Sequence, residues 1–75
     1  MKIRVIGQNQ TEVTNGNMSI LFSYNTPVAY VNHQLGKFFK TSKKWSKTTS
    51  KHINQWLDGS DASEISQEQL EKEVA

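Results

Sequence analysis

The sequence predicts an α+β fold: a small antiparallel β-sheet of four to five strands in a meander, one packed helix, and a short acidic C-terminal helix. Three observations support this prediction. Apolar and polar residues alternate in the first half of the chain, Asn15-Gly16 and a proline mark turns between the alternating stretches, and the first helical spacing of large apolar residues comes later, at Ile53, Trp56 and Leu57.

The first strand is expected at residues 2–5, because Ile3 and Val5 alternate with the basic residues Lys2 and Arg4. Asn15-Gly16 predicts a hairpin, because both residues tolerate the positive φ of a tight turn. A two-residue loop at this site would pair Val13 with Met18.

Residues 18–24 form the clearest predicted strand, with apolar side chains at the even positions and Leu21 as an exception on the other face. Asn25-Thr26-Pro27 predicts a turn, because proline fixes φ and lacks an amide donor. Residues 28–31 and 37–41 are expected to be two further strands, joined by a short loop. Together these strands would make an antiparallel meander.

One helix is expected from about residue 48 to residue 58, because Ile53, Trp56 and Leu57 lie at positions i, i+3 and i+4. This apolar stripe would cover one face of the sheet, with Trp56 at the centre of the core. Asp58-Gly59 is a plausible end of the helix, with glycine in the left-handed conformation. Three residues remain alternative candidates for the N-cap: Ser46, Thr48 and Thr49.

The chain is expected to divide into a sheet-plus-helix domain at residues 1–58 and a linker with a short acidic helix at residues 59–75. Ser66 and Gln69 have the spacing of a capping box, which predicts where this last helix begins. Apolar residues occupy the two positions of a hydrophobic staple, Ile65 and Leu70.

Charge is segregated along the sequence. Residues 1–57 contain eight basic residues and one acid, a net charge of +7, whereas residues 58–75 contain six acids and one lysine, a net charge of −5. The acidic tail has three interpretations: a solubilising appendage, a segment that folds back over the basic face, or a mimic of nucleic acid toward a protein partner.

The chain has no cysteine, which excludes disulfides, thiolate catalysis and cysteine-ligated zinc, and fits a reducing compartment. We identify no secretion signal, and the longest apolar stretch, residues 20–22, is far shorter than a membrane span. The expected location is therefore the cytoplasm, with no membrane partner.

Enzymatic function is not expected from these residues. Glu12 is the only carboxylate in the basic part, and paired-carboxylate catalysis needs two. Ser50, His52 and Asp58 are residue types of a hydrolase triad, but no nucleophile elbow or oxyanion hole accompanies them. His33 and His52 have no neighbours at metal-ligand spacing. We expect no catalytic residue, no metal and no cofactor.

The most informative segment is residues 37–51, which holds six lysines, three aromatics and no acid. Its hydroxyls and lysines converge on a helix N-terminus, where backbone amides and the helix dipole favour a phosphate. Trp45 is suited to stack on a nucleobase. The candidate residues for binding nucleic acid or phosphate are Lys40, Lys43, Lys44, Trp45, Lys47, Thr48, Thr49 and Lys51.

A plainer interpretation of the same segment stays open. The lysines would then form an ordinary solvated face, and the aromatics Phe38, Phe39 and Trp45 would belong to the core of a domain that is short of large apolar residues.

Two stretches of the sequence carry a resemblance. The chain resembles a group of small uncharacterised phage-encoded proteins in the segments that follow. The first is Ser23-Tyr24-Asn25-Thr26-Pro27-Val28-Ala29. The second is Lys44-Trp45-Ser46-Lys47-Thr48-Thr49-Ser50-Lys51-His52-Ile53-Asn54, preceded by Lys37-Phe38-Phe39-Lys40-Thr41. The resemblance covers residues 20–57. It implies a phage or prophage origin and expression in the host cytoplasm, and it assigns no catalytic residue.

Two functional hypotheses follow. The first is a non-enzymatic accessory protein that binds nucleic acid through the basic helix N-terminus. The second is a protein that binds and inhibits a host defence system, of the anti-CRISPR or anti-restriction type. The expected partner is therefore nucleic acid or a host protein, and a homodimer is also compatible with a small core and open sheet edges.

Overall fold

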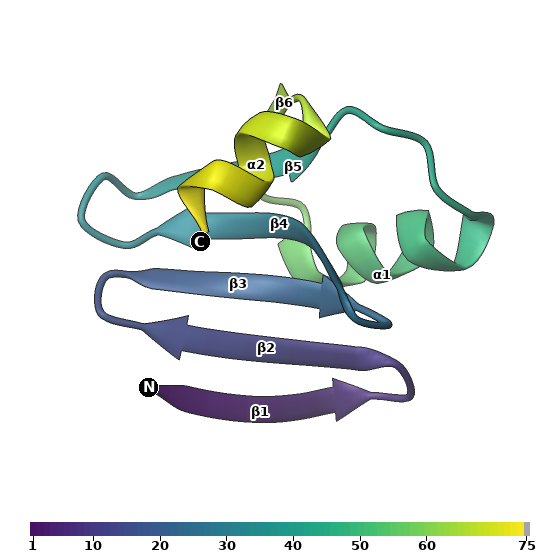
Figure 1. Ribbon diagram of the computed structural model, residues 1–75, viewed down its shortest axis with the longest axis horizontal. Coiled ribbons are helices and arrows are strands. Elements are labelled where there is room, and N and C mark those ends of the chain that lie inside the picture. The colour runs from purple at the N-terminus through teal and green to yellow at the C-terminus, as the bar shows by residue number, and fades with distance from the viewer. Residues whose placement is uncertain (75) are drawn as a thin grey trace.

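Six strands form one sheet, and their order in space follows their order in the chain (Figure 1). The computed structural model describes residues 1–74. The first five strands are antiparallel neighbours, and the sixth runs parallel to the fifth. The strands are β1 (Lys2–Gly7), β2 (Gln10–Asn15), β3 (Met18–Ser23), β4 (Thr26–Asn32), β5 (Lys37–Thr41) and β6 (Ala62–Ile65).

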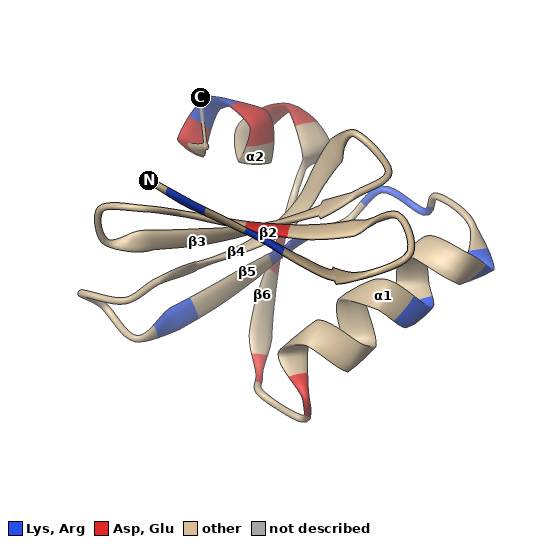
Figure 2. Cartoon of the chain, turned by 90° about the horizontal axis from the view of Figure 1, so that it is seen from below, with Lys and Arg blue, Asp and Glu red and all other residues tan. Residues whose placement is uncertain are grey.

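Two helices cover opposite faces of this sheet (Figure 2). Helix α1 (Lys47–Leu57) connects β5 to β6, as the parallel pairing of these strands requires, and α2 (Gln67–Glu73) follows β6. Because side chains alternate along a strand, neighbouring residues serve different cores. Leu21 packs with α1, whereas Ile20 packs with α2, which explains the apparent exception at Leu21 in the sequence pattern.

The predicted α+β class and meander are confirmed, but the structure adds β6 to the expected four to five strands. The prediction of a linker at the start of residues 59–75 was wrong for Ala62–Ile65, which pair with β5. A short, serine- and acid-containing segment carries little strand signal of its own. It becomes a strand because the outer edge of β5 offers unpaired backbone groups to the chain returning from α1.

The first predicted hairpin is present, but its loop lies one residue later than predicted, so the partner of Val13 moves by two residues. Asn15 pairs with Met18, and Val13 pairs with Ile20, so the two-residue loop is Gly16-Asn17. Gly16 has a φ of 61° and stands at the first central position of the loop, which is where a type II′ turn requires glycine.

Helix α1 begins and ends within one residue of the predicted bounds. Ser46 is the N-cap, because its hydroxyl accepts a hydrogen bond from the Thr49 amide at 3.1 Å. The predicted apolar stripe faces the sheet: Ile53 and Leu57 are buried in the core, and Trp56 packs against it. At the other end, Asp58 itself takes the left-handed conformation, followed by Gly59.

The last helix begins as its capping box predicted, with the Ser66 hydroxyl accepting from the Gln69 amide at 3.1 Å. Ile65 and Leu70 lie in the same apolar cluster, as expected for a hydrophobic staple. No helix in residues 1–74 has the length and apolar character that a membrane crossing needs.

Candidate functional site

An open groove of about 820 Å³ lies along the segment before α1 and the exposed side of that helix. We call it the lysine groove. None of the described residues that line it is acidic. Its lining residues are Lys44, Trp45, Ser46, Lys47, Ser50, Lys51, Asn54 and Gln55.

A second hollow, of about 300 Å³, adjoins the lysine groove and shares Lys44 with it. Lys40 and Lys43 line this hollow together with Glu64 of β6. The five candidate lysines and Trp45 therefore all line these two adjoining hollows. The Glu64 carboxylate lowers the positive charge of the smaller hollow, next to Lys40 and Lys43.

Trp45 lies outside both apolar clusters and is 41% exposed. The Lys43 ammonium lies 4.1 Å from the centre of its ring, a cation–π contact that orients the indole. Phe38 and Phe39, in contrast, pack against the cores on opposite faces of the sheet. The plainer interpretation of the aromatics is thus correct for the two phenylalanines and wrong for Trp45.

Thr49 does not belong to the candidate site. Its side chain is buried, its Oγ1 lies 3.1 Å from Ser23 Oγ, and the Ser46 hydroxyl donates to it at 3.3 Å. Thr49 stands one helical turn before Ile53, so it faces the sheet. Thr48 is exposed, next to Lys51.

Ser23 from the first resembling segment and Thr49 and His52 from the second form a buried polar cluster. Ser23 Oγ lies 3.0 Å from His52 Nδ1 and also contacts Thr49. His52 is buried because it faces β3. Ser23 is only 2% exposed, so we interpret this serine–histidine contact as a packing feature that fixes the histidine ring.

A third hollow, of about 500 Å³, lies on the other side of Lys51 and Gln55 from the groove and shares these two residues with it. We call it the amide pocket, because amide side chains dominate it. Tyr24, His52 and Thr48 complete its lining. The amides are Gln8, Asn9, Gln10 and Gln55.

Sequence reasoning missed the amide pocket, since its residues come from three separate segments. The available signal was Tyr24, a large aromatic residue at the end of a predicted strand, directly before the predicted turn. It occupies the two-residue loop between β3 and β4 with a φ of 59°, and its ring is 51% exposed.

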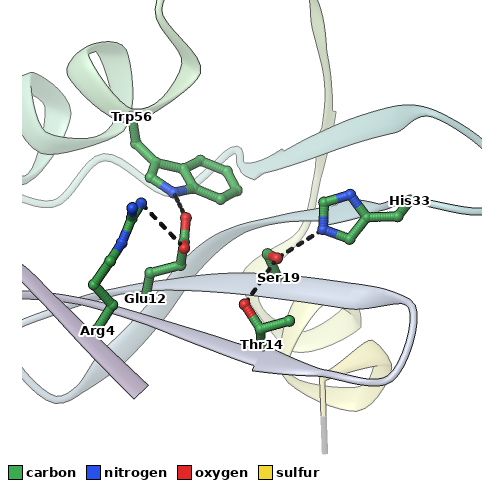
Figure 3. A network of polar contacts seen from close by, with 6 residues as sticks. All are labelled: Arg4, Glu12, Thr14, Ser19, His33 and Trp56. Carbon is green, nitrogen blue, oxygen red and sulfur yellow. Dashed lines mark hydrogen bonds and ion pairs between the residues drawn. The ribbon is translucent and has the colours of Figure 1, made fainter. Parts of the chain in front are cut away.

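Glu12, the only acid of the basic part, contacts Trp56 and Arg4 (Figure 3). Its carboxylate accepts a hydrogen bond from the Trp56 indole N–H at 2.8 Å and pairs with the Arg4 guanidinium at 3.2 Å. A second network in the same view places His33 Nε2 at 2.7 Å from Ser19 Oγ. Neither network engages a lysine of the groove.

The helix of the acidic tail, α2, does not fold back over the basic face. Helix α2 packs on β4 and β5 through Leu70, on the face of the sheet opposite α1 (Figure 2). The fold-back interpretation is therefore wrong for α2, because its apolar side packs in the second core. Of the rest of the tail, Glu64 in β6 does line the hollow that holds Lys40 and Lys43. Within residues 1–74, no three His, Cys, Asp or Glu side chains group together as a metal site would require.

The sequence matches a family of unknown function, DUF8033, over residues 1–72. The chain belongs to this family. No curated protein and no solved structure matches it. The DUF8033 match includes every strand, both hollows and the lysine groove.

Proposed function

We propose that this DUF8033 chain is a non-enzymatic accessory protein, of phage origin and acting in the host cytoplasm, that binds nucleic acid through the lysine groove. The observation that carries the proposal is the gathering of Lys44, Lys47 and Lys51 with the half-exposed Trp45 in one acid-free groove. The lysine ammonium groups would bind backbone phosphates, and a nucleobase would stack on the Trp45 indole ring.

The start of α1 is electrostatically unfavourable without an anion. Lys47 and Lys51 are four residues apart on the same helix, which makes them repelling neighbours, and Lys47 lies at the positive end of the helix dipole. The first turn contains no acid that would offset either effect. A bound phosphate chain would relieve both, so this charge arrangement supports an anionic ligand.

The test is fluorescence anisotropy of labelled oligonucleotides over a salt series. Binding should weaken with salt, with a log–log slope of about −2 to −4 for three to five phosphate contacts. The variant K44A/K47A/K51A should lose most of the affinity and lower the slope by about 2 units. The matched control K2A/K37A/K72A also removes three positive charges, but at positions outside the groove, and it should bind nearly as the wild type does.

Two results would contradict the proposal. One is the absence of binding to single- and double-stranded oligonucleotides at about 50 mM salt. The other is an equal loss of affinity in the two triple variants, because binding would then depend on net charge rather than on the groove.

A second candidate function is inhibition of a host defence protein through the outer strand β1. No strand within residues 1–74 pairs with its outer edge, and Ile3 and Val5 are 66% and 75% exposed. Exposed apolar residues on an open edge are typical of surfaces that accept another chain. Crosslinked capture from host lysate should yield one defined protein that the variant I3T/V5T no longer retains. Sedimentation equilibrium separates this result from pairing of two copies of the chain.

A further inference from the structure

The amide pocket has a different chemistry from the lysine groove beside it. Amide side chains each offer an N–H donor and a carbonyl acceptor, whereas the groove offers mainly ammonium groups. Lys51 and Gln55 line both hollows, so the groove and the pocket adjoin at these two side chains.

Tyr24 presents an aromatic ring at this pocket from a strained position. Its φ of 59° lies in the left-handed region, at the first residue of a two-residue hairpin loop, where glycine is the favoured residue. Its N–H donates to the Asn9 carbonyl at 2.7 Å, which holds the loop against the β1–β2 turn. A half-exposed ring gains little from burial, so core packing does not explain a tyrosine here.

The ring of Tyr24 also packs near a second aromatic ring, that of His52. Its centroid lies 6.3 Å from that of His52, and the His52 ring is fixed by the contact of its Nδ1 with Ser23. An aromatic surface that is held in place loses little side-chain freedom when a ligand stacks on it.

We propose that the amide pocket receives one unpaired nucleobase, stacked on Tyr24 and bonded by the surrounding amides, while the lysine groove holds the adjoining phosphates. This inference rests on the proposed function and specifies its ligand as single-stranded nucleic acid. In a duplex, both faces of a base are stacked and its pairing edge is occupied. Only an unpaired base presents a face to Tyr24 and an edge to the amides.

The experiment compares a labelled oligothymidylate of about fifteen nucleotides with a duplex of the same length, by anisotropy in low salt. The wild type should bind the single strand more tightly than the duplex. The variant Y24G should weaken single-strand binding by about fivefold or more and leave duplex binding unchanged. The groove variant K44A/K47A/K51A should weaken both.

Glycine is chosen at position 24 because it suits the observed φ, so the hairpin loses strain rather than gaining it. The melting temperature of Y24G should therefore be close to that of the wild type. Any decrease should be no larger than the loss of the contact with His52 accounts for. The variant Y24N, which also tolerates a left-handed backbone, provides the second measurement if Y24G is less stable.

The outcomes separate the two proposals. Equal affinity for single strand and duplex, with no effect of Y24G or Y24N, would overturn the inference about the amide pocket and leave the lysine groove standing. Failure of both probes to bind would overturn the proposed function and this inference together.

Discussion

Glu12 joins the outer hairpin to α1, because its carboxylate both accepts from the Trp56 indole and pairs with Arg4. The variant E12A should lower the free energy of unfolding by about 1–2 kcal/mol, since it leaves the partly buried indole N–H without its acceptor. E12Q keeps an acceptor and should cost less. Urea denaturation followed by tryptophan fluorescence measures both variants.

The exposed partner of Glu12 provides the control. Arg4 is mostly solvated, so R4A should change the stability by less than about 0.5 kcal/mol. Equal losses in E12A, E12Q and R4A would show that the ion pair, and not the indole hydrogen bond, carries the effect.

Tyr30 makes stability depend on alkaline pH. Burial raises the pKa of its hydroxyl above the ordinary value, and the Glu73 carboxylate raises it further. The folded state therefore holds this proton more tightly than the unfolded state does. Its contribution is fully present below about pH 10 and is lost as the pH rises through the folded-state pKa.

The variant Y30F isolates this effect, because it keeps the ring that stacks on Phe39 and removes the titrating hydroxyl. Unfolding free energies measured from neutral to strongly alkaline pH should fall more steeply for the wild type than for Y30F. Parallel curves for the two proteins would contradict the assignment.

For individual residues, the sequence predicted the structural role well where that role depends on neighbours in the chain. It predicted the cap at Ser66 and included Ser46 among three candidate caps of α1, because a hydroxyl before a helix has a local partner. It misplaced Thr49, whose partner Ser23 is distant in sequence. Contacts of this kind depend on tertiary packing, which no local pattern encodes.

The C-terminal helix α2 is an integral element of the fold, and its residue Leu70 is fully buried in the second core. We expect L70A to lower the free energy of unfolding by about 2–5 kcal/mol, because it removes a large buried side chain and leaves a cavity that neighbouring side chains fill only partly. Thermal and urea denaturation both measure this loss.

Leu35 is the matched control, because it is the same residue type at an exposed loop position. L35A should change the stability by less than about 0.5 kcal/mol. If L70A were as mild as L35A, α2 would be an appendage, as one interpretation of the acidic tail held.

The elements themselves were predictable where their apolar periodicity was strong. β3, β5 and α1 were placed to within about one residue at each end. β6 was missed because a four-residue strand gains its structure from the edge it meets, not from its own composition. The loop register at Gly16 was missed by one residue because Asn15-Gly16 and Gly16-Asn17 are both acceptable turns.

Across the whole molecule, the segregation of charge in the sequence is only partly kept in space. Basic residues gather at the start of α1, and three of the six acids of the tail lie on α2, on the other side of the sheet (Figure 2). The other three lie between the end of α1 and β6: Asp58, Asp61 and Glu64. A molecule with this field would approach a polyanion with the start of α1 first. The sequence predicted the basic region, but the sheet that separates it from α2 was visible only in three dimensions.

The most direct measurement of the central claim is a titration of the isotope-labelled protein with single-stranded oligonucleotide, followed by backbone amide NMR shifts. The largest changes should occur at residues 44–55 and at Tyr24, and the amides of α2 should remain unchanged. Changes confined to α2 or β1, or no changes at about 50 mM salt, would contradict the account.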